Sequence, residues 1–80
     1  MELTYTQNMI INASRAYTEN VVVDIDPIKV TQQLHTEFLD SLLDKTAVQL
    51  GFDRLTIRDG VIYGVDSYHN DVILTEKRKA

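Results

Sequence analysis

The residues best suited to chemistry lie close together between positions 66 and 71. Asp66, His69 and Asp71 offer two carboxylates and an imidazole, which can ligate a divalent cation. Ser67 beside His69 could supply the nucleophile and base of a hydrolase. Aspartate and asparagine also favour turns, and an 80-residue chain leaves little room for the pocket and oxyanion hole that a hydrolase needs. We therefore expect a turn here, with no metal site, no cofactor and no enzyme activity.

A predicted helix from Thr36 to Leu50 carries an acidic side. Glu37, Asp40 and Asp44 are separated by steps of three and four, which places them on one helix face. Such a face can simply be solvated. It can also dock on a basic protein surface, including one that normally binds nucleic-acid phosphates. We interpret these three acids as candidate partner-binding residues.

An alternative site combines arginines and an aromatic ring on the outer face of a predicted sheet with a basic C-terminal tail. Aromatic rings beside arginines can stack the bases of a single strand. The net charge is -4, and the first 51 residues carry seven acids against three bases, so electrostatics opposes nucleic acid there. The residues of this alternative site are Arg54, Arg58, Tyr63, Lys77, Arg78 and Lys79.

The main helix is the segment around which the other elements must pack. Thr36 can cap its first turn and Gly51 can end its last turn in the left-handed conformation. Asp26 and Pro27 suit the cap and first position of a preceding short helix, with a break at His35–Thr36; one continuous helix over residues 27–50 is the alternative. The buried face of the main helix is predicted from Phe38, Leu39, Leu42, Leu43, Ala47, Val48 and Leu50.

The residues before Asp26 show a period of two. Leu3–Ala13 and Val21–Ile25 alternate in polarity and are rich in residues that suit strands. We expect them to form a hairpin with its turn within Asn12–Arg15. A helix over Gln7–Tyr17, with Met9, Ile10, Ala13 and Tyr17 on one face, is the competing interpretation.

The clearest local signal is Asp59–Gly60, which supplies the backbone angles of a two-residue hairpin turn. Pairing Arg58 with Val61 sets Ile57 opposite Ile62 and leaves one apolar face for the helix. A last strand is expected over Val72–Thr75, before a frayed charged tail. The face of the hairpin opposite to the apolar one would carry Arg54, Thr56, Arg58, Val61, Tyr63 and Val65.

These elements predict one α+β domain over residues 1–80, in the order ββαββ. A small antiparallel sheet of four to five strands would be packed on one face by one main helix. No apolar run is long enough to span a membrane, and the N-terminus lacks the features of a secretory signal. The absence of cysteine fits the cytoplasm.

We expect a small non-enzymatic module that binds a protein partner through its acidic helix face or an exposed sheet edge, with homodimerisation left open. In general character the chain resembles the small proteins encoded by phages and prophages, which often bind and inhibit a host protein. No sequence motif carries that resemblance. It implies an inhibitor or adaptor of a host protein, whereas the alternative is a nucleic-acid-binding protein.

Overall fold

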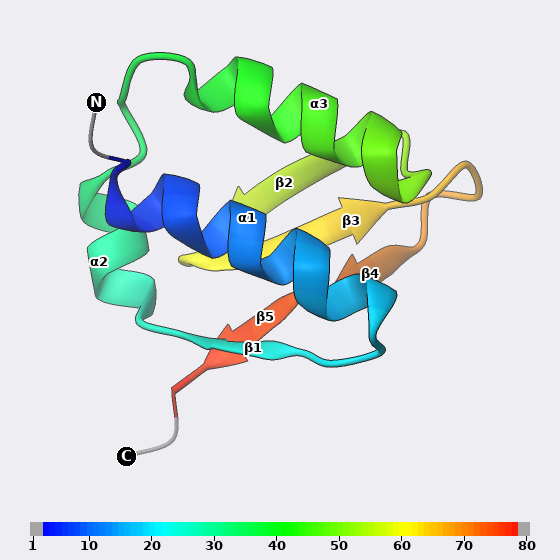
Figure 1. Cartoon of the computed structure of the whole chain (residues 1–80), viewed down its shortest axis with the longest axis horizontal. Coiled ribbons are helices and arrows are strands. Elements are labelled where there is room, and N and C mark those ends of the chain that lie inside the picture. The colour runs from blue at the N-terminus through cyan, green and yellow to red at the C-terminus, as the bar shows by residue number, and fades with distance from the viewer. Residues whose placement is uncertain (1–2, 79–80) are drawn as a thin grey trace.

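The computed structural model describes residues 3–78 and contains three helices and five short strands within them (Figure 1). One strand lies among the three helices and four strands follow them, so the order is αβααββββ and the expected ββαββ order is wrong. In sequence they are α1 (Tyr5–Thr18), β1 (Val23–Ile25), α2 (Pro27–Gln32), α3 (Leu39–Leu50), β2 (Arg54–Arg58), β3 (Val61–Val65), β4 (Asp71–Ile73) and β5 (Thr75–Lys77).

The first segment is a helix, so the predicted N-terminal hairpin is wrong and the competing helix interpretation is close to the structure. A capping box starts α1: the Thr4 hydroxyl accepts from the Gln7 amide at 3.1 Å, and the Gln7 side chain accepts from the Thr4 amide at 2.9 Å. Ile10 and Ala13, one turn apart, are fully buried. Capping and burial thus outweigh the strand preference of the β-branched residues nearby.

The segment from Asp26 to Gly51 contains two helices, as the expected break predicted. The Asp26 carboxylate caps α2, and Gly51 ends α3 with φ of 81°. The predicted start of the main helix is wrong, because Thr36 and Glu37 precede α3. Phe38 is the residue before α3 and adopts the left-handed conformation, with φ of 65° and no side-chain cap.

The predicted hairpin is confirmed with its register. Arg58 pairs with Val61 and Ile57 with Ile62, and the turn residues Asp59 and Gly60 have φ of 52° and 75°. A Cβ atom at Gly60 would lie 2.3 Å from the Pro27 carbonyl oxygen. The turn therefore packs directly against the start of α2, and only glycine leaves room for that contact.

The strands do not form the single antiparallel sheet that we expected. β2, β3 and β4 form an antiparallel sheet, whereas β1 pairs with β5 in parallel as a second, two-stranded sheet. Leu74 separates β4 from β5 within the predicted last strand, and its backbone joins the sheets. Its amide donates to Ile62 at 3.0 Å and its carbonyl accepts from Val23 at 3.3 Å.

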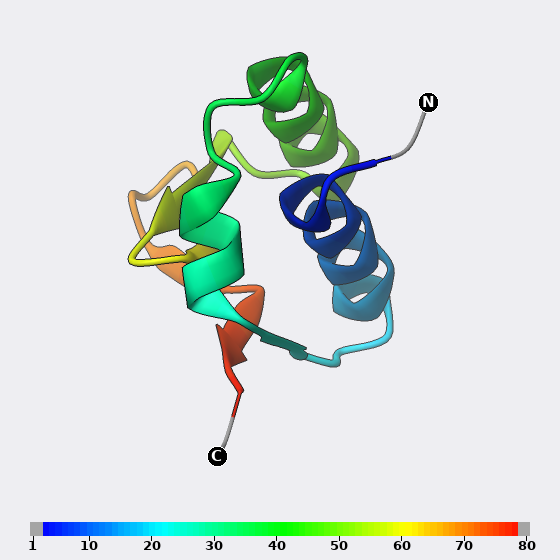
Figure 2. The same cartoon turned by 90° about the vertical axis from the view of Figure 1, so that its left-hand side faces the viewer.

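Helices α1 and α3 cover one side of the strands, and α2 closes one end of the layer (Figure 2). The core between the layers includes Ile10, Ile25 and Ile62, all fully buried. The predicted buried face of α3 is corrected at two places: Phe38 is 60% exposed and Val48 is 80% exposed. Leu42 and Leu43 are half-buried. Among residues 3–78, none of the helices is long and apolar enough to cross a membrane.

Candidate functional site

The loop that could have carried chemistry is a hydrogen-bonded turn. The Asp66 carboxylate accepts from the backbone amides of Tyr68 and Asn70, both at 2.9 Å, and from the Asn70 side chain at 3.3 Å. The backbone hydrogen bond from Asn70 contributes most to lowering the pKa of Asp66. Ser67 and His69 are exposed. Over the described part of the chain, residues 3–78, no three His, Cys, Asp or Glu residues are placed to hold a metal.

The outer face of the three-stranded sheet is occupied by its own residues. Arg58 forms an ion pair with Asp71, and its guanidinium carbon lies 4.5 Å from the centre of the Tyr63 ring. The hydrogen bond to Asp71 raises the pKa of Arg58. Thus the structure brings Arg58 and Tyr63 of the alternative site together. The charge of Arg58 is already paired with Asp71, and the ring face of Tyr63 already contacts Arg58. Arg54 is exposed on the same face.

Two other predicted members of that face are not available to a ligand. Val61 and Val65 are only 6% and 3% exposed, whereas Tyr63 between them on β3 is half-buried. The basic tail is also partly ordered: Lys77 ends β5, and the Arg78 amide donates to Ile25 at 2.9 Å. The expected fraying before residue 79 is therefore wrong. Lys79 lies outside the described residues.

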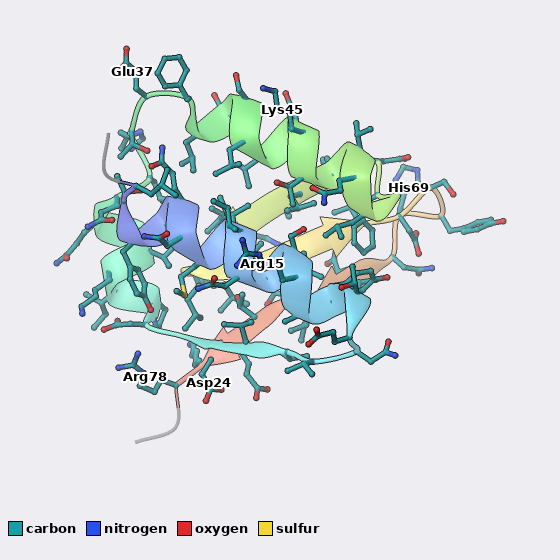
Figure 3. All side chains as sticks on the ribbon, viewed as in Figure 1. Arg15, Asp24, Glu37, Lys45, His69 and Arg78 are labelled. Carbon is teal, nitrogen blue, oxygen red and sulfur yellow. The ribbon has the colours of Figure 1, made fainter. Side chains whose placement is uncertain are left out.

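The acidic residues Glu37, Asp40 and Asp44 are all exposed. Only Asp40 and Asp44 belong to α3, one turn apart, while Glu37 lies in the segment before it (Figure 3). Val48 continues the row one turn after Asp44 and is 80% exposed. Asp40 and Asp44 are therefore solvated side chains on the outside of α3, with Asp40 favourably placed in its first turn.

A groove between α1 and α3 is the most distinctive surface of the molecule. It consists of two adjoining hollows of about 310 and 380 Å³ that share Leu42 and Lys45. We call this surface the α1–α3 groove. Its lining residues are Leu3, Gln7, Ile11, Ser14, Arg15, Phe38, Ser41, Leu42, Lys45, Thr46 and Gln49.

The α1–α3 groove combines an apolar floor with positive charge. Leu3, Ile11 and Leu42 contribute aliphatic side chains. Arg15 on α1 and Lys45 on α3 add positive charge to the lining. Neither cation makes an ion pair or side-chain hydrogen bond to another residue between positions 3 and 78. Within residues 3–78, no acidic side chain lines the groove, so the charge of its described lining differs in sign from that of the whole chain.

The end of the groove nearest the N-terminus is fixed by hydrogen bonds. The Gln7 side chain donates to the Glu37 carbonyl at 3.1 Å, which joins α1 to the segment before α3. Thr6 is fully buried and donates to the Val30 carbonyl at 3.1 Å. These contacts hold α1 against its neighbours, so the two walls of the groove are set by the fold.

Sequence reasoning missed this groove because it assigned residues 3–13 to a strand. Leu3, Gln7 and Ile11 recur every four residues, which on a helix is a row along one side. This row was the available signal.

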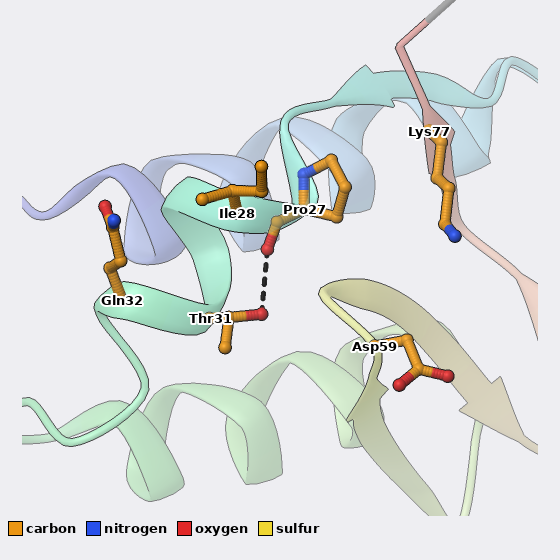
Figure 4. A pocket seen from close by; sticks show the side chains of 6 residues that line it. All are labelled: Pro27, Ile28, Thr31, Gln32, Asp59 and Lys77. Carbon is orange, nitrogen blue, oxygen red and sulfur yellow. Dashed lines mark hydrogen bonds between the residues drawn. The ribbon is translucent and has the colours of Figure 1, made fainter.

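A third hollow, of about 370 Å³, lies between α2 and the hairpin turn (Figure 4). Asp59 and Lys77 place opposite charges at its edge, and the Thr31 hydroxyl is already used, since it donates to the Pro27 carbonyl at 2.8 Å. The mixed charge favours no ligand of one sign, so this hollow is a weaker candidate than the α1–α3 groove.

No protein-family model matches this chain, and comparisons with curated proteins and with solved structures also returned no match. The function is therefore inferred from the geometry of the site itself.

Proposed function

We propose that this protein is a non-enzymatic module that binds another protein through the α1–α3 groove, as an inhibitor or adaptor of that partner. The observation that carries the proposal is the combination of an apolar floor with two cations in the lining that have no partner among residues 3–78. Apolar surface left exposed between polar edges is typical of a protein-interaction site.

A protein partner agrees better with this surface than a nucleic acid. The groove offers mainly aliphatic side chains and a single aromatic ring, Phe38, where a nucleic-acid site would offer several cations and stacking rings. The chain also carries a net charge of -4, which repels phosphates. The arginine and tyrosine that could have stacked a base, Arg58 and Tyr63, already contact each other.

The acidic residues Glu37, Asp40 and Asp44 form the second candidate contact surface. They lie on the outside of the segment that forms one wall of the groove, so a large partner could contact both sides of α3. We rank the groove first because Asp40 and Asp44 are exposed and adjoin none of the three hollows.

Site-specific photo-crosslinking in a lysate of the native source tests the proposal. A photoreactive residue at Gln49, in the groove, is compared with the same residue at Gln32, which is also exposed and helical but lies on α2. We expect a discrete adduct from position 49 and none from position 32. Replacing Phe38 by Ser, at the far end of the groove, should abolish the adduct without unfolding the chain, because Phe38 is 60% exposed.

Equal adducts from positions 49 and 32 would indicate contact without a defined site and would contradict the proposal. An adduct that persists unchanged in the Phe38→Ser protein would do the same. Circular dichroism of each variant provides the check on folding, so that a lost adduct is assigned to the surface and not to unfolding.

A further inference from the structure

We propose that the α1–α3 groove binds an amphipathic α-helix of the partner protein, with acidic residues beside its apolar stripe. This inference rests on the proposed function and specifies the occupant of the same site. Grooves between helices commonly receive an amphipathic helix, whose apolar side chains recur every three or four residues.

The length of the groove suits a helix of three to four turns. Its walls are α1 with 14 residues and α3 with 12 residues, which correspond to lengths of about 21 and 18 Å. Both helices begin at the same end of the molecule (Figure 1), so the groove runs along both of them. An occupant of three to four turns, about 11–14 residues, matches that length.

The charge of the groove specifies the polar residues of the occupant. The first 51 residues contain three bases, Arg15, Lys29 and Lys45, and two of these three line the groove. Lys29 instead lies 5.5 Å from the centre of the Tyr5 ring. Acidic side chains on the occupant can pair with Arg15 and Lys45, whereas a basic helix would be repelled.

The conformation and exposure of Phe38 provide a second observation in favour of binding in the groove. A non-glycine residue in the left-handed conformation is strained, yet Phe38 has φ of 65° and keeps a large apolar ring 60% exposed. Glycine or asparagine would suit that backbone better. A strained, exposed aromatic residue at the end of an apolar groove is typical of an anchor for a partner side chain.

The most direct experiment uses two synthetic peptides of 16 residues with the whole protein. Both peptides carry leucine at alternating steps of three and four; one has Glu beside the leucines and the other has Lys at the same positions. We expect the Glu peptide to bind with a dissociation constant of about 10–100 µM and the Lys peptide to bind at least tenfold more weakly. Amide chemical shifts should change along α1 and α3.

Charge reversal of the protein supplies the decisive comparison. The Arg15→Glu, Lys45→Glu variant should lose the preference for the Glu peptide and prefer the Lys peptide. The matched control is Lys77→Glu, Arg78→Glu, which changes the net charge equally on a part of the chain away from α3 (Figure 3). This control should keep the original preference within about twofold, since distant surface charges are screened by salt.

Equal affinity for the two peptides, no binding of either at millimolar concentration, or shift changes outside α1 and α3 would each overturn the inference. Sedimentation measurements that show a dimer, in which a second copy of the chain fills the groove, would also overturn the inference. If these outcomes occur while the adduct from position 49 persists, the proposed function stands and only the helical, acidic occupant is rejected.

Discussion

Two surfaces of this protein place cations beside apolar side chains, but they differ in what those cations contact. On the outer sheet face, Arg58 pairs with Asp71 and covers the Tyr63 ring. In the α1–α3 groove, Arg15 and Lys45 share the lining with apolar side chains and have no ion-pair partner among residues 3–78. The outer sheet face engages Arg58 but leaves Arg54 exposed and without an ion pair among residues 3–78, whereas neither cation of the groove has an ion pair there.

Residue type alone therefore does not identify a binding surface. A ligand on the outer sheet face would have to replace the contacts of Arg58 with Asp71 and Tyr63 before gaining any of its own. A ligand in the groove replaces only water around Arg15 and Lys45. We therefore propose the groove as the binding surface, although it has no more cationic residues than the sheet face.

Alanine substitutions of two adjacent isoleucines on α1 should differ most in their effects on stability and on peptide binding. Ile10 is fully buried in the core, and Ile11 lines the groove and is half-buried. Ile10→Ala should lower the free energy of unfolding by about 2–4 kcal/mol, through lost burial and a residual cavity. Ile11→Ala should cost less than about 1 kcal/mol but should weaken binding of the Glu peptide by about fivefold or more.

Urea titrations and fluorescence anisotropy measure the two effects in the same preparations. The Ile10→Ala protein, at temperatures where it remains folded, should bind the peptide almost normally. The comparison fails if Ile11→Ala is as destabilising as Ile10→Ala, because α1 would then bury its groove side.

Replacing Phe38 by glycine should change stability and binding of the Glu peptide in opposite directions. Phe38→Gly removes left-handed strain of about 1–2 kcal/mol, and the extra freedom of glycine in the unfolded chain offsets about 0.5–1 kcal/mol of that gain. We expect a net stabilisation of about 0.5–1 kcal/mol, or a rise of a few degrees in melting temperature. Binding of the Glu peptide should weaken by about fivefold. A variant that is less stable, or that binds as well as the original, would contradict the role of Phe38 as an anchor.

The parts of the fold that could be predicted from sequence are those fixed by neighbouring residues. Asp59–Gly60 sets the hairpin and its register, Asp26–Pro27 sets the start of α2, and Gly51 sets the end of α3. Each depends on backbone angles or caps within a few positions. These are short-range effects that a single sequence displays directly.

The rest depends on contacts between distant segments. The alternation over residues 3–13 favoured a strand, but burial of Ile10 and Ala13 against the core selected α1. The parallel pairing of β1 with β5 joins residues about fifty positions apart, and no local pattern reports it. Because the groove has α1 as one wall, the error in α1 also concealed the candidate site.

The ion pair on the outer sheet face predicts an absence of nucleic-acid binding, and its removal should have a smaller effect than the changes above. The chain should show no salt-dependent affinity for a single-stranded oligothymidine, because Arg58 is neutralised by Asp71 and the net charge is -4. Asp71→Asn releases Arg58 and should produce only a slight gain at low ionic strength, with little loss of stability, since the pair is half-exposed. Strong binding by the original protein that falls steeply with added salt would restore the nucleic-acid alternative.

The smallest expected effect concerns Asp66, in the loop beside the outer sheet face. Its pKa is lowered, chiefly by the hydrogen bond from the Asn70 amide, so the folded state holds the carboxylate form more strongly than the unfolded state does. Its stabilising contribution is therefore present above the unfolded pKa of about 4 and is lost as pH falls through the lower folded value. An NMR titration of the Asp66 carboxyl carbon should give a midpoint below 3.8, together with loosening of the loop in acid.

Asp66→Asn should remove this acid dependence and leave peptide binding in the groove unchanged, because the two sites share no residue. A midpoint at or above the ordinary value would show that the turn hydrogen bonds do not hold the carboxylate.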